Sequence, residues 1–332
     1  MPGRVAKVLS EPLLDVRSFG RQGRRDRMTI RADLELAMRT VARTPEVIVK
    51  VSGGAKSVKG AIAHLRYIDR DGTLEVETDE GWRLKAQELA GALVSEWDLE
   101  ASAAHARASY RGQGGRRPAK LLHNVILSMP RGTPAQRLLA ASRVFAREQF
   151  GLQHRYAMVL HTDQDHPHVH LVVKAVSEEG RRLNIRKATL REWRRQFAHH
   201  LREQGVPANA TERAVRGCSQ STFKDGVYRA SQRGESRYLR ERLARLLEVE
   251  RHGVLEPSPG KAKLLETRRA VVAGWHAAAE SLADAGQGAL AQKIWGFIGG
   301  MQPPLTTDEQ LSRSGFDRPR IREREQQPER TR

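Results

Sequence analysis

The chain has 332 residues, which is enough for one large domain with extensions. Its formal net charge is +19, from 58 Lys and Arg against 39 Asp and Glu, and this excess predicts a polyanionic partner, DNA or RNA. The lack of a long apolar run and of a lipidation signal argues against membrane insertion. The single cysteine, Cys218, excludes an internal disulfide and a cysteine-based zinc site, and without a signal peptide the expected location is the cytoplasm.

Composition and pattern divide the chain into four expected segments. Residues 1–45 hold an Arg/Gly-rich arm and an amphipathic helix, and residues 46–235 hold the main domain. Residues 236–302 are expected to form helices, interrupted by a Gly/Pro-rich stretch at 253–260. Residues 303–332 begin with two prolines and continue as an Arg-rich tail that we expect to be flexible.

A helix expected over 57–69, after a strand over 46–51, carries a tyrosine in an unusual place. Ser57 is the expected N-cap. The apolar stripe of this helix consists of Val58, Ala61, Ile62, Leu65 and Ile68. On a helical wheel Tyr67 lies opposite Val58, so packing does not explain it. The alternative is an ordinary amphipathic surface tyrosine.

The elements after this helix follow from periodicity and from capping residues. A short strand over 74–77, a helix over 84–110, a Gly/Arg loop over 112–118 and a strand over 121–129 are expected. The next helix has Thr133 as its N-cap and Pro134 at its first position, and it ends at Phe150. Later helices are expected over 189–204, 236–250, 261–284 and 287–298, with a basic, loop-rich connection over 206–235.

Residues 156–175 contain two apolar runs that are separated by a polar turn. The runs are typical of buried strands, and Pro167 belongs in the turn because proline cannot donate to a strand ladder. Four of the twelve histidines fall within ten positions here: His161, His166, His168 and His170. We therefore expect an antiparallel hairpin with the histidines near its turn.

The alternation of strand side chains makes this hairpin a candidate metal site. His168 and His170 share one face of the second strand, and His161 and Asp163 share one face of the first. Neutral imidazole is the commonest protein metal ligand, and three imidazoles leave open positions for water or substrate. The sequence thus predicts a divalent-metal site at His161, His168 and His170, with Asp163 as a base or as a partner that orients an imidazole.

Other interpretations stay open at this point. Solvated histidines in a polar turn would explain any one of the four, but not four histidines and two aspartates together. The run His166-Pro-His168-Val-His170-Leu-Val also fits the histidine-triad nucleotide hydrolases, which use a histidine nucleophile and no metal. That function explains neither the net charge nor Tyr67. A non-catalytic DNA-binding accessory protein would fit the charge, but not a motif with all three histidines in place.

Three stretches together resemble the motifs of the conjugative relaxases, which are mobilisation nucleases of the HUH endonuclease class. The stretch His161-x-Asp-x-Asp-His-Pro-His-x-His170 resembles their third motif, and His64-Leu-Arg-Tyr-Ile-Asp-Arg-Asp-Gly-Thr-Leu-Glu75 resembles their first. The stretch Asn124-Val-Ile-Leu-Ser-Met-Pro-Arg-Gly-Thr133 resembles the strand between them. Order and spacing agree over about residues 46–235, most closely with the P-type mobilisation branch that includes the T-DNA border nuclease.

The resemblance implies an α+β fold: a central antiparallel sheet flanked by helices, with a helical C-terminal extension. It implies strand-specific nicking at a transfer origin, in which Tyr67 attacks the phosphodiester and leaves a 5′-phosphotyrosyl strand and a free 3′-hydroxyl. Asp163 is the first candidate to help deprotonate Tyr67. The family commonly uses Mg²⁺ or Mn²⁺, although three imidazoles also suit Zn²⁺ or Co²⁺.

The expected partners follow from the same resemblance. They are transfer-origin DNA, single-stranded near the nick, relaxosome accessory proteins and a type IV coupling protein, with export of the protein attached to DNA. Asp165, His166 and Lys174 are candidates for orienting the metal site or contacting phosphate, and Lys174 stands where the family often has asparagine. The basic candidates for the DNA path are Arg70, Arg107, Arg111, Arg116, Arg117, Arg181, Arg182, Arg186 and Lys187.

Overall fold

The computed structural model describes residues 30–85, 89–110, 119–219, 223, 225–252 and 259–313. The chain divides into two compact units, Ala42–Ala210 and a second unit that joins Met1–Val41 with Thr211–Arg332. The predicted main domain, 46–235, extends too far at its C-terminal end. Residues 211–219 belong with the C-terminal helices, because Val215 is buried against Val271 and its carbonyl accepts a hydrogen bond from Trp275 Nε1 at 2.9 Å.

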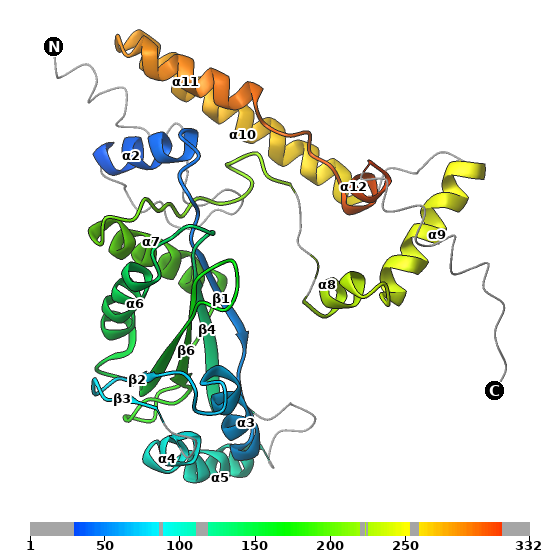
Figure 1. Cartoon of the computed structure of the whole chain (residues 1–332). Coiled ribbons are helices and arrows are strands. Elements are labelled where there is room, and N and C mark those ends of the chain that lie inside the picture. The colour runs from blue at the N-terminus through cyan, green and yellow to red at the C-terminus, as the bar shows by residue number, and fades with distance from the viewer. Residues whose placement is uncertain are drawn as a thin grey trace. The chain divides into compact units, whose positions relative to one another are not determined.

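One antiparallel sheet forms the centre of the unit Ala42–Ala210, with the strand order β1-β4-β6-β5-β2-β3 (Figure 1). Its strands are β1 (Ile48–Gly53), β2 (Val76–Thr78), β3 (Arg83–Leu84), β4 (Leu122–Ser128), β5 (Tyr156–His161) and β6 (His168–Lys174). The histidine hairpin supplies β5 and β6, as predicted. Strand β6 is buried along its whole length because it has a neighbouring strand on each edge and helices on both faces of the sheet.

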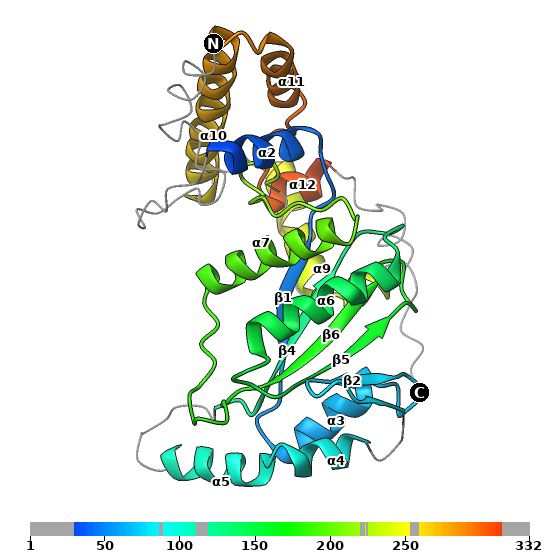
Figure 2. The same ribbon diagram turned by 90° about the vertical axis from the view of Figure 1, so that its left-hand side faces the viewer.

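Helices cover the two faces of this sheet. Helices α6 (Ala135–Phe150) and α7 (Lys187–Glu203) lie across one face, as Figure 2 shows. They pack on the side chains that β4 and β6 direct to this face, among them Leu127 and Leu171. Helices α3 (Val58–Ile68), α4 (Leu89–Glu96) and α5 (Leu99–Tyr110) pack on the other face, against Leu122, Val159 and Val172. The predicted α+β architecture, a central antiparallel sheet flanked by helices, is confirmed.

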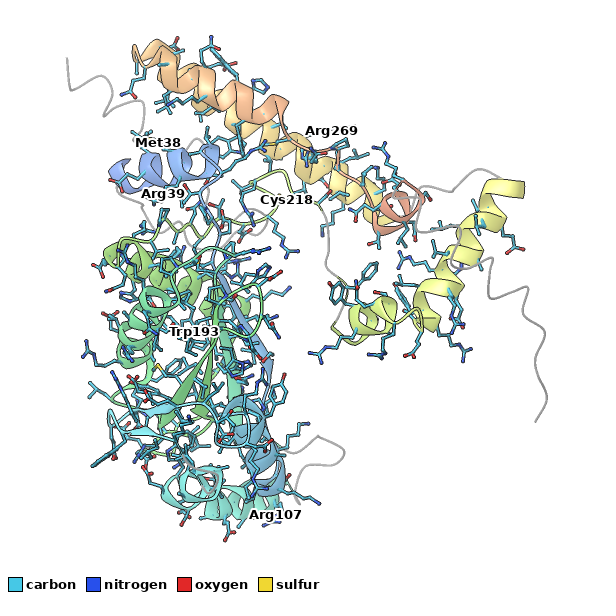
Figure 3. All side chains as sticks on the ribbon, in the orientation of Figure 1. Met38, Arg39, Arg107, Trp193, Cys218 and Arg269 are labelled. Carbon is cyan, nitrogen blue, oxygen red and sulfur yellow. The ribbon has the colours of Figure 1, made fainter. Side chains whose placement is uncertain are left out.

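An aromatic cluster lies where α6 and α7 pack on the first face of the sheet. Phe145 is fully buried, and its ring centroid lies 6.2 Å from that of Trp193, which is labelled in Figure 3, and 5.9 Å from that of Phe197. We expect Phe145→Ala to lower the free energy of unfolding by about 3–5 kcal/mol, because it removes a large buried side chain and leaves a cavity. Urea denaturation followed by tryptophan fluorescence measures this.

The matched control for Phe145→Ala is Leu152→Ala, because Leu152 is 100% exposed just beyond the same helix. It should change the free energy of unfolding by less than about 0.5 kcal/mol. Equal effects of the two substitutions would show that the cluster around Phe145 does not carry the stability of this unit.

Two local predictions are wrong. The helix expected over 84–110 is split: Arg83–Leu84 pairs as β3, and α4 and α5 are separated at Asp98, which has φ 47° while the preceding Trp97 is buried. Thr133 is also not an N-cap. Its hydroxyl donates to the Pro130 carbonyl at 2.9 Å, and Pro134 takes the N-cap position of α6.

The second unit is helical. Its elements are α2 (Ile30–Val41), α8 (Asp225–Gln232), α9 (Arg237–His252), α10 (Pro259–Asp284), α11 (Gly288–Gly299) and α12 (Thr307–Arg313). Helices α10 and α11 pack side by side, with the rings of Trp275 and Phe297 5.3 Å apart. Among the described helices none is long and apolar enough to cross a bilayer.

Two features of this unit differ from expectation. Helix α8 lies within the connection that was predicted to be loop-rich. The tail predicted over 303–332 is folded at its start, because α12 buries Leu311 against Leu239 and Leu246 of α9. The rest of that tail, 314–332, and the arm 1–29 lie outside the described residues.

Candidate active site

The hairpin brings three histidines together at the start of β6. In the register of β5 and β6, His161 faces His168 and Val159 faces His170, so all three imidazoles emerge on one face of the sheet. The ring centroids are 4.5–5.1 Å apart, and one ring nitrogen from each lies within 4.8 Å of the others. The convergence that strand alternation predicted is therefore present in the fold.

The second ring nitrogen of each histidine has a hydrogen-bond partner that sets the ring's orientation. His161 Nε2 lies 2.6 Å from the Ile68 carbonyl oxygen, and His168 Nδ1 lies 3.0 Å from the His166 carbonyl oxygen. A carbonyl oxygen can only accept, so these nitrogens carry the protons. His170 Nδ1 lies 3.4 Å from Asn124 Oδ1 and 3.2 Å from Asn124 Nδ2. Donation from Nδ1 to Oδ1 is the contact that leaves Nε2 free for a metal.

Burial disfavours protonation of His161 and His170. Desolvation lowers the pKa of His170 to about 3, with the neighbouring His161 and His168 acting in the same direction. Desolvation also lowers the pKa of His161. A neutral imidazole offers its lone pair, so three buried nitrogen donors with their other nitrogens occupied fit a divalent cation. All three histidines are at most 7% exposed, so they are part of the buried interior of the sheet.

Asn124 is a site residue for which the sequence suggested no role. It is a buried amide on β4, and besides contacting His170 it donates to Ser52 Oγ at 2.7 Å. Sequence reasoning looked instead to Lys174 for an orienting residue. Lys174 shares the sheet face of the histidines, but it lies four residues beyond His170, about 13 Å along the strand, and pairs with Glu178 at 3.0 Å. The sequence signal that could have pointed to Asn124 was an amide side chain directly before the apolar run Val125-Ile126-Leu127.

Tyr67 lies beside the three histidines. Ser57 caps α3 by accepting from Gly60 N, and Ala61, Leu65 and Ile68 are buried, as predicted. The Tyr67 side chain is therefore on the outer side of the helix and is 52% exposed. Its ring centroid is 6.3 Å from that of His170 and 6.5 Å from that of His64. An exposed phenol thus adjoins a buried cluster of imidazoles.

Asp163 is engaged by Arg70 rather than by the tyrosine. Its Oδ2 accepts from Arg70 Nη2 at 2.6 Å, and this hydrogen bond holds the pKa of the Asp163 carboxyl below its usual range. A carboxylate that is stabilised in this way is a weaker base. The structure therefore disfavours the predicted role of Asp163 in deprotonating Tyr67, because its hydrogen bonds run to a guanidinium.

The remaining predicted residues lie in different places. Asp165 and His166 are exposed in the hairpin turn, where His166 contributes its carbonyl to His168. Arg181 pairs with Glu179. Arg182 donates to the Lys120 carbonyl, which lies just before β4, whereas His168 pairs with Ser128 at the far end of that strand. Arg186 and Lys187 are exposed at the N-terminus of α7, and Arg107 is exposed on α5 (Figure 3). Three further candidates, Arg111, Arg116 and Arg117, lie outside the described residues.

Comparison with known families identifies the class of nuclease domain to which part of this chain is similar. Residues 78–206 match the family described as "Relaxase: MobA/VirD2-like, nuclease domain", so this chain contains such a domain and the resemblance drawn from its motifs is confirmed. The matched residues include the three histidines and Asn124; Tyr67 lies just before them.

Curated relatives agree with this family. The chain is 28% identical over 216 residues to the T-DNA border endonuclease VirD2 of Agrobacterium fabrum, covering 59% of this chain and 46% of the relative. It is 31% identical over 139 residues to the VirD2 of Rhizobium rhizogenes, covering 39% of this chain and 30% of the relative. The chain thus spans less than half the length of these relatives.

A solved structure titled "Molecular Basis of Vancomycin Resistance Transfer in Staphylococcus aureus" is also similar. It shares 13% identity with a TM-score of 0.31, covering 51% of this chain and 99% of that one.

Proposed function

We propose that this protein nicks one strand of DNA at a transfer origin, with Tyr67 as the nucleophile and His161, His168 and His170 as metal ligands. One observation carries the proposal: the exposed Tyr67 ring stands 6.3 Å from the ring of His170, within a domain that matches the relaxase nucleases on either side of its histidine motif. The endonuclease activity itself is named in the curated relatives, and it extends to this chain as part of the proposal.

The reaction is a transesterification. The Tyr67 oxygen bonds to the scissile phosphorus as the bond from phosphorus to the 3′-oxygen breaks, and the phenol proton leaves while the 3′-oxygen gains one. The products are a 5′-phosphotyrosyl strand and a free 3′-hydroxyl, and because one phosphodiester replaces another the step can be reversed without ATP. When bound, a divalent cation would polarise the non-bridging phosphate oxygens.

The chain's own residues supply the positioning. His161, His168 and His170 present lone pairs from fixed rings, and Asn124 orients His170. The Arg70 guanidinium lies 5.3 Å from the Tyr67 ring centroid and adds a positive charge where a phosphate must approach. Mg²⁺ or Mn²⁺ is the ion we propose, with Zn²⁺ or Co²⁺ also suited to three nitrogen donors.

The wider setting belongs to the same proposal. Transfer-origin DNA, single-stranded near the nick, would be the substrate, and relaxosome accessory proteins and a type IV coupling protein would be the partners. The protein would act in the bacterial cytoplasm and leave the cell attached to the strand. The net charge of +19 suits binding to the DNA backbone, with affinity that falls steeply as salt rises.

The histidine-triad hydrolase alternative is not supported, because the histidine motif falls within a matched relaxase nuclease domain. The accessory-protein alternative fits the net charge but does not account for the three converging histidines.

The direct test is formation of a covalent adduct. The full chain is incubated with Mn²⁺ and labelled single-stranded oligonucleotides that tile candidate origin regions, and the products are separated under denaturing conditions. We expect a protein–DNA species together with a shorter strand that a polymerase can extend from its 3′-hydroxyl. Cleavage without an adduct would indicate a hydrolase, and binding without cleavage would indicate an accessory protein.

A further inference from the structure

Arg70 is held against the candidate metal site by an unusual stretch of backbone. It lies two residues beyond the last residue of α3, and both Arg70 and Asp71 have positive φ, 55° and 54°. Such conformations are unfavourable for residues other than glycine and persist where surrounding contacts hold them. Here the turn folds the guanidinium back, so that Arg70 Nη1 donates to the Tyr67 carbonyl at 3.1 Å.

The same guanidinium reaches one particular nitrogen of the histidine cluster. Arg70 Nη2 lies 3.3 Å from His161 Nδ1 as well as 2.6 Å from Asp163 Oδ2. Because the proton of His161 is on Nε2, which donates to the Ile68 carbonyl, Nδ1 carries the lone pair. Arg70 therefore donates to the only atom through which His161 could bind a metal.

A lone pair on an imidazole nitrogen serves one partner at a time. A metal bound to His161 Nδ1 would lie about 2 Å from it, in the direction from which Nη2 now approaches. The positive guanidinium would also repel a divalent cation at this range, to an extent reduced by the paired Asp163 and by the partial exposure of both side chains, 31% and 51%.

We propose that Arg70 competes with the divalent cation for the lone pair of His161 Nδ1, and that Asp163, whose hydrogen bond with the same Nη2 is the shorter one, remains as the partner of Arg70 when the cation takes this nitrogen. This inference rests on the proposed function, in which the three histidines bind a metal. Arg70 thereby weakens metal binding, whereas Asp163 strengthens it through Arg70. Both are positioning residues that set the metal affinity of the site.

The test is isothermal titration of the full chain with Mn²⁺ in the absence of DNA. We expect Arg70→Ala to bind Mn²⁺ about tenfold more tightly than the wild type, because a partly screened unit charge is removed from beside the site. Asp163→Asn should bind it several-fold more weakly. Arg70→Lys, which keeps the charge on a shorter reach, should lie between the wild type and Arg70→Ala.

The double variant separates a partner of Arg70 from a direct ligand. In the Arg70→Ala background, Asp163→Asn should cost clearly less affinity than in the wild type, because there is no guanidinium left to release. An equal or larger loss would mean that Asp163 itself binds the cation and would overturn the role given to it. The matched control is Arg66→Ala: Arg66 is exposed on the last turn of α3, and its removal should leave Mn²⁺ affinity unchanged.

The outcomes distinguish this inference from the proposed function. If the wild type binds Mn²⁺ and Arg70→Ala binds it equally or less well, with an unchanged circular-dichroism spectrum, the competition is refuted while the metal centre stands. If neither protein binds Mn²⁺, both fail. If only Arg70→Ala binds it measurably, the competition is supported in its strongest form.

Discussion

Tyr67→Phe is expected to abolish the covalent DNA adduct and strand nicking, by at least about 10³-fold, while single-strand binding and Mn²⁺ affinity stay within about twofold of the wild type. The substitution keeps the ring that lies beside His170 and removes only the oxygen that would bond to phosphorus. The side chain is 52% exposed, so the free energy of unfolding should be unaffected. Denaturing electrophoresis of the labelled oligonucleotide measures the adduct, and fluorescence anisotropy measures DNA binding.

Tyr228→Phe is the matched control, because Tyr228 is 54% exposed on α8 in the other unit. This variant should form the adduct at the wild-type rate. Among the described tyrosines Tyr156 is buried in the sheet, and Tyr238 hydrogen-bonds Arg242 of α9. Persistence of a covalent species in Tyr67→Phe would assign the nucleophile to another residue and would refute the mechanism proposed above.

Removing a histidine of the cluster is expected to remove the metal and, with it, the nicking activity. In His168→Ala or His170→Ala, Mn²⁺ affinity should fall more than about 100-fold, since even the outer partners of metal ligands are worth about 10–100-fold. Titration calorimetry measures the affinity, and the oligonucleotide assay should show no adduct in either variant. Addition of a chelator to the wild type should reproduce the loss of nicking.

The burial of these histidines requires a control for stability. His154 is as buried as His168, at 7%, and it hydrogen-bonds the Lys174 carbonyl at 2.9 Å, away from the cluster. His154→Ala should therefore cost a similar amount of stability but leave Mn²⁺ affinity intact. A loss of stability in His168→Ala with no change in metal content would show that the cluster is structural.

Local periodicity was sufficient for much of this site. The alternation of side chains in a strand and the stripe of a helix depend on residues only a few positions apart, so the hairpin over Tyr156–Lys174, the convergence of its three histidines and the exposed position of Tyr67 could all be predicted. The motifs carried the resemblance to the relaxases for the same reason, because each is contiguous.

The tertiary structure alone decided which distant groups meet. Asn124 reaches His170 from the neighbouring strand, and Arg70 reaches Asp163 from 93 residues away, so that the carboxylate expected to act as a base is held by a guanidinium. The grouping of residues 211–219 with the C-terminal helices depends in the same way on Val215 packing beneath Trp275. Such partners are chosen by the packing of whole elements, and periodicity within one segment holds no information about which segment will lie against it.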